Sequence, residues 1–506
     1  MERPHLLLAL LLNYCLLPFV AAQETPPPPV PTPAEYAAAV ERLVDFLALP
    51  NDGNYPEQVA ANLRWCDEAF RAEGFTTRKL ETSGAPLLFA ERRYHDDSPA
   101  VLFYLQIDGQ PVDTASWDQD SPYRAVLKAP RKDGSFELVE NPQTPPAADT
   151  RLFARSSSDS KGPALAFLTA LGIMRERGEI PPYNVKVIMD FQEELGSPTL
   201  PAAVEANRAL FAARYLVIMD GTRHVSNLPT LTFGARGMTT VSLRVFGANK
   251  ALHSGQYGNF APNPVFTASR LLAAMKDEDG RVLVPGWYDG VALSEDQKRE
   301  MNQVPESWED IERMIGIARS ERVGETYQEA LQYPSLNVRG LRAAWTGKEV
   351  RTLIPEEVII ELDLRLVPET PGERQVGLLR QFIADRGFHF VDGEPTVAER
   401  ERYPKLIAMT HKIGSAPFRT DLGGPFDAWL TRAVTRALGA PPIRMRTTGG
   451  SQPMAPFVSK LGLPAVSLRI PNPDNSIHAP NENLRLGNFY EGIRECLGVL
   501  TEPLGE

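Results

Sequence analysis

The sequence predicts an α/β protein with a mostly parallel sheet, into which a second, α+β domain is inserted. Three observations support this fold class. The 506-residue chain is 43% hydrophobic and 23% charged, as ordinary globular proteins are. Short β-rich runs alternate with helical stretches up to about residue 220, which favours parallel strands covered by helices. After Phe233, polar and apolar residues alternate along the strands, as in half-exposed antiparallel sheets.

The first segment of the parallel-sheet domain is predicted over residues 34–234. Apolar residues at helical spacing indicate its helices, and apolar β-branched runs indicate its strands. In chain order we expect helices at 36–47 and 62–70, a strand at 100–107, a helix at 164–177, and strands at 185–191 and 214–219.

The inserted domain is predicted over residues 235–398, and the parallel-sheet domain resumes over 399–506. The polar stretch at 280–332 is interpreted as helical decoration of the insert. The expected elements are strands at 238–246 and 357–366, helices at 264–275 and 373–385, a late strand at 465–470 and a closing helix at 488–500.

The N-terminus has the pattern of a secretory signal peptide over residues 1–22. Arg3 precedes a mostly apolar stretch that ends in the small residues Ala21 and Ala22. An uncleaved anchor is the alternative, but the apolar run is shorter than the roughly 20 residues that a membrane span needs. Residues 23–33 form a proline-rich linker. We therefore expect a secreted or periplasmic protein without a membrane segment after cleavage.

Charge and cysteine content narrow the function classes. The formal net charge of −11 and the pI of about 5.4 argue against a nucleic-acid partner. Export would leave Cys66 and Cys496, which could form a disulfide in an oxidising compartment or remain as two buried thiols.

Acidic residues and one histidine follow several predicted strands or stand in nearby loops. Sites in parallel α/β folds lie at the carboxyl ends of the strands. A single aspartate there is usually a turn residue, so the prediction depends on the whole set. Carboxylates with imidazole suit zinc and related divalent ions. The set comprises Asp108, Asp159, the pair Glu193 and Glu194, Asp220 and His478.

With these motifs in this order, the sequence from about Tyr36 to the C-terminus resembles the M20 family of metallopeptidases. That family includes glutamate carboxypeptidase-like enzymes, aminoacylases and carnosinase-type dipeptidases. Its pattern His-x-Asp-x-x-Pro aligns with residues 106–111, which read QIDGQP. Its aspartate before Lys-Gly aligns with Asp159, and its Glu-Glu pair with Glu193 and Glu194.

The resemblance implies roles for these residues. Asp159 would bridge two metal ions, and Glu194, Asp220 and His478 would be further ligands. Glu193 would act as general base, and Asp108 would position a ligand. The implied cofactor is Zn²⁺, as one or two divalent ions, with Mn²⁺ or Co²⁺ as alternatives.

The inserted segment resembles the lid and dimerisation domain of the family. His253 corresponds to a histidine that reaches the site of the partner subunit, so a homodimer is implied. Thr352 and Arg365 resemble the residues that hold the terminal carboxylate of a substrate in the dipeptidase branch. Gly450 and Ser451 resemble the glycine-rich loop that closes the same pocket.

One position departs from the family pattern: Gln106 stands where the first histidine ligand is expected. An amide oxygen is a poorer zinc ligand than imidazole. The departure is compatible with a weakened first metal, a different metal such as manganese, a single-metal enzyme, or a binding protein that has lost catalysis. Glu193 argues against the last, because a binding protein needs no general base.

The resemblance therefore implies metal-dependent hydrolysis of a dipeptide or C-terminal peptide bond next to a free carboxylate. An N-acyl amino acid amidohydrolase would share every motif and remains an alternative. A non-catalytic periplasmic peptide-binding protein is the alternative from a different class.

Overall fold

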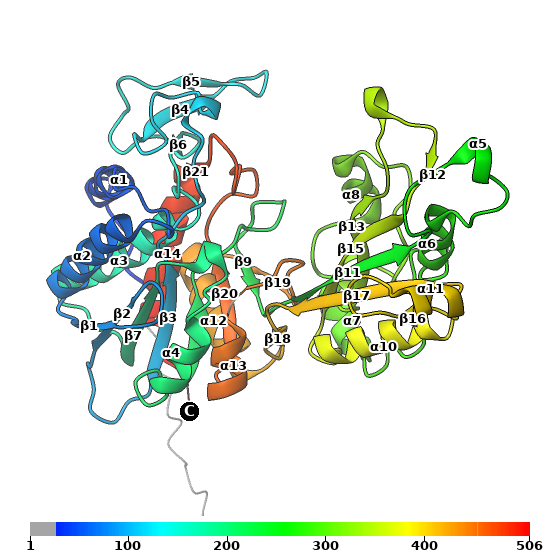
Figure 1. The fold of residues 1–506 in the computed structure, drawn as a ribbon. Coiled ribbons are helices and arrows are strands. Elements are labelled where there is room, and N and C mark those ends of the chain that lie inside the picture. Colours follow the sequence, from blue (N-terminus) through cyan, green and yellow to red (C-terminus); the bar gives the residue numbers. More distant parts are fainter. Residues whose placement is uncertain (1–26, 453, 506) are drawn as a thin grey trace, which may run out of the picture.

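The structure is a computed structural model that describes residues 27–452 and 454–505, and it contains two units side by side (Figure 1). The predicted signal peptide lies outside the described residues, as do the first residues of the proline-rich linker. Among the described helices, none has the length and hydropathy required to cross a bilayer.

The first unit is built on an eight-stranded sheet. Its four central strands, β7, β3, β8 and β20, are parallel, which confirms the predicted mostly parallel sheet. The strand order is β1 (Thr76–Leu80), β2 (Leu87–Arg92), β7 (Asn184–Asp190), β3 (Ala100–Gln106), β8 (Tyr215–Ile218), β20 (Ala465–Arg469), β9 (Thr230–Thr232) and β19 (Ile443–Met445).

Helices cover both faces of this sheet, so its central strands are buried on both sides and read as continuous apolar runs. One face packs against α1 (Pro33–Leu47), α2 (Pro56–Ala72), α3 (Lys161–Arg177), α12 (Pro425–Leu438) and α14 (Leu486–Thr501). The other packs against α4 (Leu200–Ala206) and α13 (Ala455–Leu461).

A small antiparallel sheet joins the early and late parts of the chain. Strand β21 (Asn483–Arg485) pairs with β6 (Arg151–Phe153), so the loop after β6 lies against the loop before β21. The remaining elements of this region are β4 (Val126–Pro130), β5 (Phe136–Leu138), and the short 3₁₀ turns η1 (Thr114–Ser116) and η2 (Glu193–Leu195).

The second unit is a five-stranded, mainly antiparallel sheet. Strands β11 and β15 alternate buried and half-buried residues, as predicted from the sequence. The strand order is β13 (Ser335–Arg342), β15 (Glu357–Leu366), β11 (Gly237–Phe246), β17 (Leu406–Ile413) and β16 (His389–Phe390). Helices α6 (Pro264–Ala273) and α10 (Gly372–Ala384) pack on it.

Short elements complete the second unit. The stretch at 280–332 contains three short helices, which agrees with its interpretation as helical decoration. These elements are α7 (Glu295–Met301), α8 (Trp308–Ile315), α9 (Tyr327–Ala330), α11 (Val397–Arg402), η3 (Gly347–Glu349), and at the outer end β12 (Leu252–His253), α5 (Ser254–Tyr257) and β14 (Leu353–Ile354).

The predicted end of the insert at residue 398 falls inside this unit. Strand β17 lies beyond that position, yet it pairs with β11 over residues 406–413. The chain returns to the first unit only after β17, where β18 (Phe418–Arg419) pairs with β10 (Gly234–Ala235). The boundary is therefore about fifteen to twenty residues later than the sequence suggested.

Cys66 and Cys496 are free and buried, so of the two alternatives the structure has separate thiols. Both belong to the core between the large sheet and the helices α1, α2, α3, α12 and α14. Burial raises the pKa of the Cys66 thiol to about 12, which keeps it protonated and unreactive.

Helices α12 and α14 approach each other closely at Gly498. A Cβ there would lie 2.5 Å from the Ala433 carbonyl oxygen and 2.8 Å from the Ala437 Cβ. We expect Gly498→Ala to destabilise the protein by about 1–3 kcal/mol, because overpacking a helix contact outweighs the helix propensity of alanine. Urea denaturation measures the change.

Gly377 provides the matched control. It lies in α10, is exposed, and has no atom within 4 Å of the position of an added Cβ. Gly377→Ala should raise the free energy of unfolding by up to ~1 kcal/mol. Equal effects of the two substitutions would show that the close helix contact does not constrain residue 498.

Candidate metal centre

The predicted site residues meet at the carboxyl ends of the parallel strands. Gln106 ends β3, the Glu193–Glu194 turn follows β7, and Asp220 follows β8. Asp159 directly precedes α3, and His478 stands in the loop between β20 and β21.

Three of these residues converge on one point. The His478 Nε2 atom lies 3.0 Å from Asp159 Oδ2 and 3.2 Å from Glu194 Oε2. The ligand atoms of the three residues all lie within 4.8 Å of one another. His478 has a φ of 60°, a left-handed conformation that costs about 1–3 kcal/mol outside glycine and is concentrated at functional sites. These three residues are placed so that they could together hold a metal ion.

Glu482 holds the loop that carries Asp159, and sequence reasoning did not assign it a role. Its carboxylate accepts hydrogen bonds from the backbone N–H groups of Ser156, Ser158 and Asp159 at 2.8–3.0 Å. The Arg155 guanidinium donates to it at 2.6 Å. The only sequence signal was its position four residues after His478 in the same loop.

Asp108 acts on the Glu-Glu turn rather than on a reacting atom. Its two carboxylate oxygens each accept a backbone N–H bond of 3.0 Å, from Glu193 and from Glu194. Gln110, two residues on, donates its side-chain amide to Glu194 Oε2 at 2.8 Å. The segment after β3 therefore fixes both the backbone and the side chain of this turn, which makes Asp108 a positioning residue.

The site carries an excess of negative charge in a buried position. Burial, and then the nearby Asp220 and Glu194, raise the pKa of Glu193 well above its usual range. Burial and Asp159 raise the pKa of Asp220 to about 6. Hydrogen bonds to Asp159 and Glu194 raise the pKa of His478 to about 10. Every shift favours added positive charge, from protons or from a cation.

Two arginines at the inserted unit contact the glycine-rich loop of the first unit. The Arg365 Nη1 atom donates to Ser451 Oγ at 3.2 Å, and the Arg236 backbone N–H donates to the Gly450 carbonyl at 3.2 Å. Burial and the neighbouring Arg365 lower the pKa of Arg236 to about 10. Two arginines beside the glycine-rich loop create a positive site, of which sequence reasoning identified Arg365 but not Arg236.

His253 and Thr352 are not brought into this cluster within one chain. They stand at the small antiparallel pair of β12 and β14, where the Ser254 N–H lies 3.4 Å from the Thr352 carbonyl, and both side chains are exposed. This strand pair lies at the outer end of the second unit, away from the large sheet (Figure 1).

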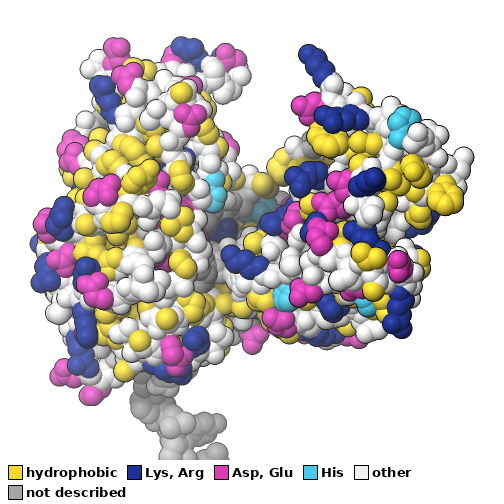
Figure 2. Space-filling view, in the orientation of Figure 1, with side chains coloured by type: hydrophobic (Ala, Val, Ile, Leu, Met, Phe, Trp, Pro, Cys, Tyr) yellow, Lys and Arg dark blue, Asp and Glu magenta, His cyan; other side chains and the backbone are white. Residues whose placement is uncertain are grey.

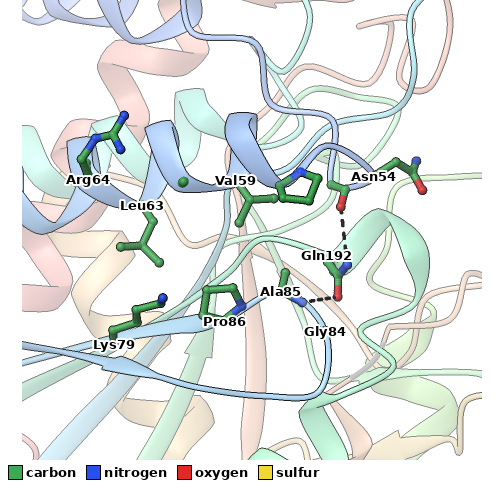
Figure 3. A pocket seen from close by; sticks show the side chains of 12 residues that line it. Asn54, Val59, Leu63, Arg64, Lys79, Gly84, Ala85, Pro86 and Gln192 are labelled. Atoms are coloured by element: carbon green, nitrogen blue, oxygen red, sulfur yellow. Dashed lines mark hydrogen bonds between the residues drawn. The ribbon is translucent and has the colours of Figure 1, made fainter.

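A cavity of 670 Å³ lies between α2 and the β1–β2 hairpin (Figure 3). Apolar side chains such as Val59 and Leu63 line it. Gln192 forms part of its wall, accepting a hydrogen bond from the Ala85 N–H at 3.0 Å. The cavity contains none of the predicted ligands, so it is distinct from the metal centre.

A family model described as peptidase family M20/M25/M40 matches residues 102–502, which include every element of the site. The chain belongs to this family. It is thus a hydrolytic enzyme, as the relatives named as dipeptidases are.

Curated relatives cover most of the chain. A Beta-Ala-His dipeptidase of Rattus norvegicus is 26% identical over 485 residues, covering 90% of this chain and 90% of that protein. A Cys-Gly metallodipeptidase of Schizosaccharomyces pombe is 26% identical over 408 residues, covering 77% and 83%. The solved structure of an M20 family metallo-carboxypeptidase from Sulfolobus solfataricus has a TM-score of 0.74 at 25% identity, covering 92% and 98% of the two chains.

One buried atom without a hydrogen-bond partner among the described residues fits the divalent ion that this M20 fold implies. The Glu194 Oε1 atom is orphaned beside the converging ligands. A buried oxygen without a donor is costly, and a hard or borderline cation satisfies it. Asp159, Glu194 and His478 would hold such an ion.

We expect Glu482→Gln to damage the M20 site by releasing the Asp159 loop. A neutral amide cannot pair with buried Arg155, so the free energy of unfolding should fall by about 3–5 kcal/mol. Metal affinity should fall roughly 10- to 100-fold, as for other residues that hold ligands in place. Calorimetric titration with zinc measures the affinity, and urea denaturation measures the free energy of unfolding. Glu373→Gln, at a carboxylate with a 76% exposed side chain, is the control and should change neither.

Proposed function

We propose that the protein is a metal-dependent dipeptidase, which hydrolyses an amide bond next to a free carboxylate. The observation that carries the proposal is the Asp159–Glu194–His478 triad with Glu193 beside it. The relatives named for Beta-Ala-His and Cys-Gly dipeptides, matched over most of the chain, support the same reaction class.

Glu193 is the proposed general base. A divalent ion held by the triad would act as a Lewis acid, polarising the scissile carbonyl and lowering the pKa of a bound water. Glu193 receives a proton from that water and returns it to the leaving amine. Burial and neighbouring carboxylates raise its pKa, and a raised carboxyl pKa suits proton transfer near neutral pH. Asp108 holds the Glu193 backbone during both transfers.

Arg365 is the proposed anchor for the carboxylate of the substrate. Its guanidinium already touches Ser451 of the glycine-rich loop, and Arg236 adds a second positive charge nearby. A carboxylate accepts charge-assisted hydrogen bonds from guanidinium groups. Binding one end of a dipeptide there would orient its amide bond relative to Glu193.

The test compares dipeptides with N-acetyl amino acids as substrates of the purified protein. We expect turnover of dipeptides that a chelator abolishes and added Zn²⁺ or Mn²⁺ restores. Glu193→Gln should keep its metal content but lose about 100- to 10,000-fold in kcat, because the general base is gone. Near-normal kcat in that variant would contradict the mechanism, and turnover of N-acetyl amino acids alone would favour the amidohydrolase.

We further propose a homodimer in which the partner subunit's His253 completes each site and stabilises the developing oxyanion. Two observations support this arrangement. His253 is exposed at the outer end of the second unit, and Phe260 and Phe266 nearby are 84% and 65% exposed. Hydrophobic side chains gather at this end of the molecule (Figure 2). Large exposed apolar groups of this kind mark interaction surfaces.

Subunit complementation tests this dimer. A chain with His253→Ala and a chain with Glu193→Gln should each form inactive homodimers. Co-expressed, they form mixed dimers in which one of the two sites has both residues, so activity should return. No recovery in isolated mixed dimers, or a monomer by light scattering, would contradict the proposal.

A further inference from the structure

We infer that the protein holds a single divalent ion, at Asp159, Glu194 and His478, and that Gln106, Gln452 and Arg469 replace a second one. The inference deepens the proposed metallopeptidase function, because it states how many ions that function uses. The family resemblance implies up to two ions, with Asp159 between them. In the structure, the two carboxylate oxygens of Asp159 have different partners, and only one of them faces His478.

Gln106 occupies the side of Asp159 where a second ion would bind. Its Nε2 atom donates to Asp159 Oδ1 at 2.6 Å, and the Ser160 hydroxyl donates to the same oxygen at 2.8 Å. The other oxygen, Oδ2, faces His478. The carboxylate requires a donor, so the amide nitrogen, which has no lone pair for a metal, faces Asp159. One oxygen of the carboxylate is thus left for an ion.

Gln452 makes the equivalent contact on Asp220. Its Nε2 atom donates to Asp220 Oδ2 at 2.7 Å. The Ser467 hydroxyl donates to the Gln452 carbonyl oxygen at 3.3 Å, which fixes the orientation of the amide. Gln452 and Ser467 are both buried. Asp220 is thereby satisfied by a neutral donor, and it does not join the three residues whose ligand atoms converge.

Arg469 supplies a permanent positive charge on the same side. It ends β20, is buried, and donates from Nη1 to the Thr222 carbonyl at 3.1 Å. A Cβ on Gly221 would lie 2.6 Å from Nη1, so the guanidinium packs directly against the residue after Asp220. Attraction to Arg469 lowers the pKa of Asp220, against the larger effect of burial.

A second divalent ion would lie close to a buried guanidinium. The Arg469 side chain packs against Gly221, directly after Asp220, so an ion bound to Asp220 would face its fixed positive charge. At low effective dielectric such repulsion is large, even between unit charges several ångströms apart.

Metal stoichiometry tests the inference on the full-length protein. After dialysis against excess Zn²⁺ and removal of free metal, elemental analysis should find about one zinc per chain. Asp220→Asn should leave this at one, whereas His478→Ala should bring it close to zero. Two zinc ions per wild-type chain, or loss of an ion in Asp220→Asn, would overturn the inference. Asp133→Asn, at an exposed carboxylate, is the control.

A gain-of-site variant tests the roles of the three replacing residues. Gln106→His combined with Gln452→Leu and Arg469→Leu should bind a second zinc ion. If that variant melts cooperatively and still holds only one, the assignment of these residues is wrong. Dipeptide turnover of the wild-type protein is measured separately. Two ions per wild-type chain with turnover would overturn only the inference. One ion per wild-type chain without turnover would overturn only the proposed function.

Discussion

The rest of the site depends on the buried carboxylate of Glu482. It accepts hydrogen bonds from the backbone N–H groups of Ser156, Ser158 and Asp159 and from the Ser158 hydroxyl, and it pairs with Arg155. A carboxylate removed from water is stable only when such donors replace its hydration. Because Glu482 and His478 share one loop, the same interaction that positions Asp159 also sets the distance between Asp159 and His478. The backbone N–H groups of Glu193 and Glu194 donate to the Asp108 carboxylate, which fixes the third ligand, Glu194, in a comparable way. Two acceptor carboxylates that bind no metal therefore define the centre.

The two units contribute different chemistry. The parallel sheet presents the ligands at its carboxyl edge, where helices on both faces keep the strands rigid. The antiparallel unit brings Arg365 and Arg236 to the glycine-rich loop. The short pairing of β10 with β18 marks where the chain passes between the units. A negative cluster that attracts cations and a positive cluster that attracts carboxylates are thus held on different units of the protein.

The sequence predicted the elements whose burial pattern is strong. Strand β3 and helix α3 read as long apolar runs, and their bounds agree with expectation to within a few residues. The edge strands β9 and β19 have three residues each, too few for a periodic signal. The residues of β17 were assigned to the parallel-sheet domain, because nothing in their sequence shows that they pair with β11 rather than with the large sheet. In the site, Gln106 was recognisable as a departure from a motif. Gln452, Arg469 and Glu482 were not, because their roles come from contacts between segments hundreds of residues apart in sequence.

The wide separation of the ligands also has a consequence for biosynthesis. Asp159 and His478 are 319 residues apart in the chain. A nascent polypeptide that ends before residue 478 lacks one of the three ligands, although its first helices and strands are already complete. Closing so long a loop costs entropy that only the finished sheet, with β20 inserted beside β8, repays. The three-ligand site is therefore complete only after residue 478 has been added and the sheet has closed around β20.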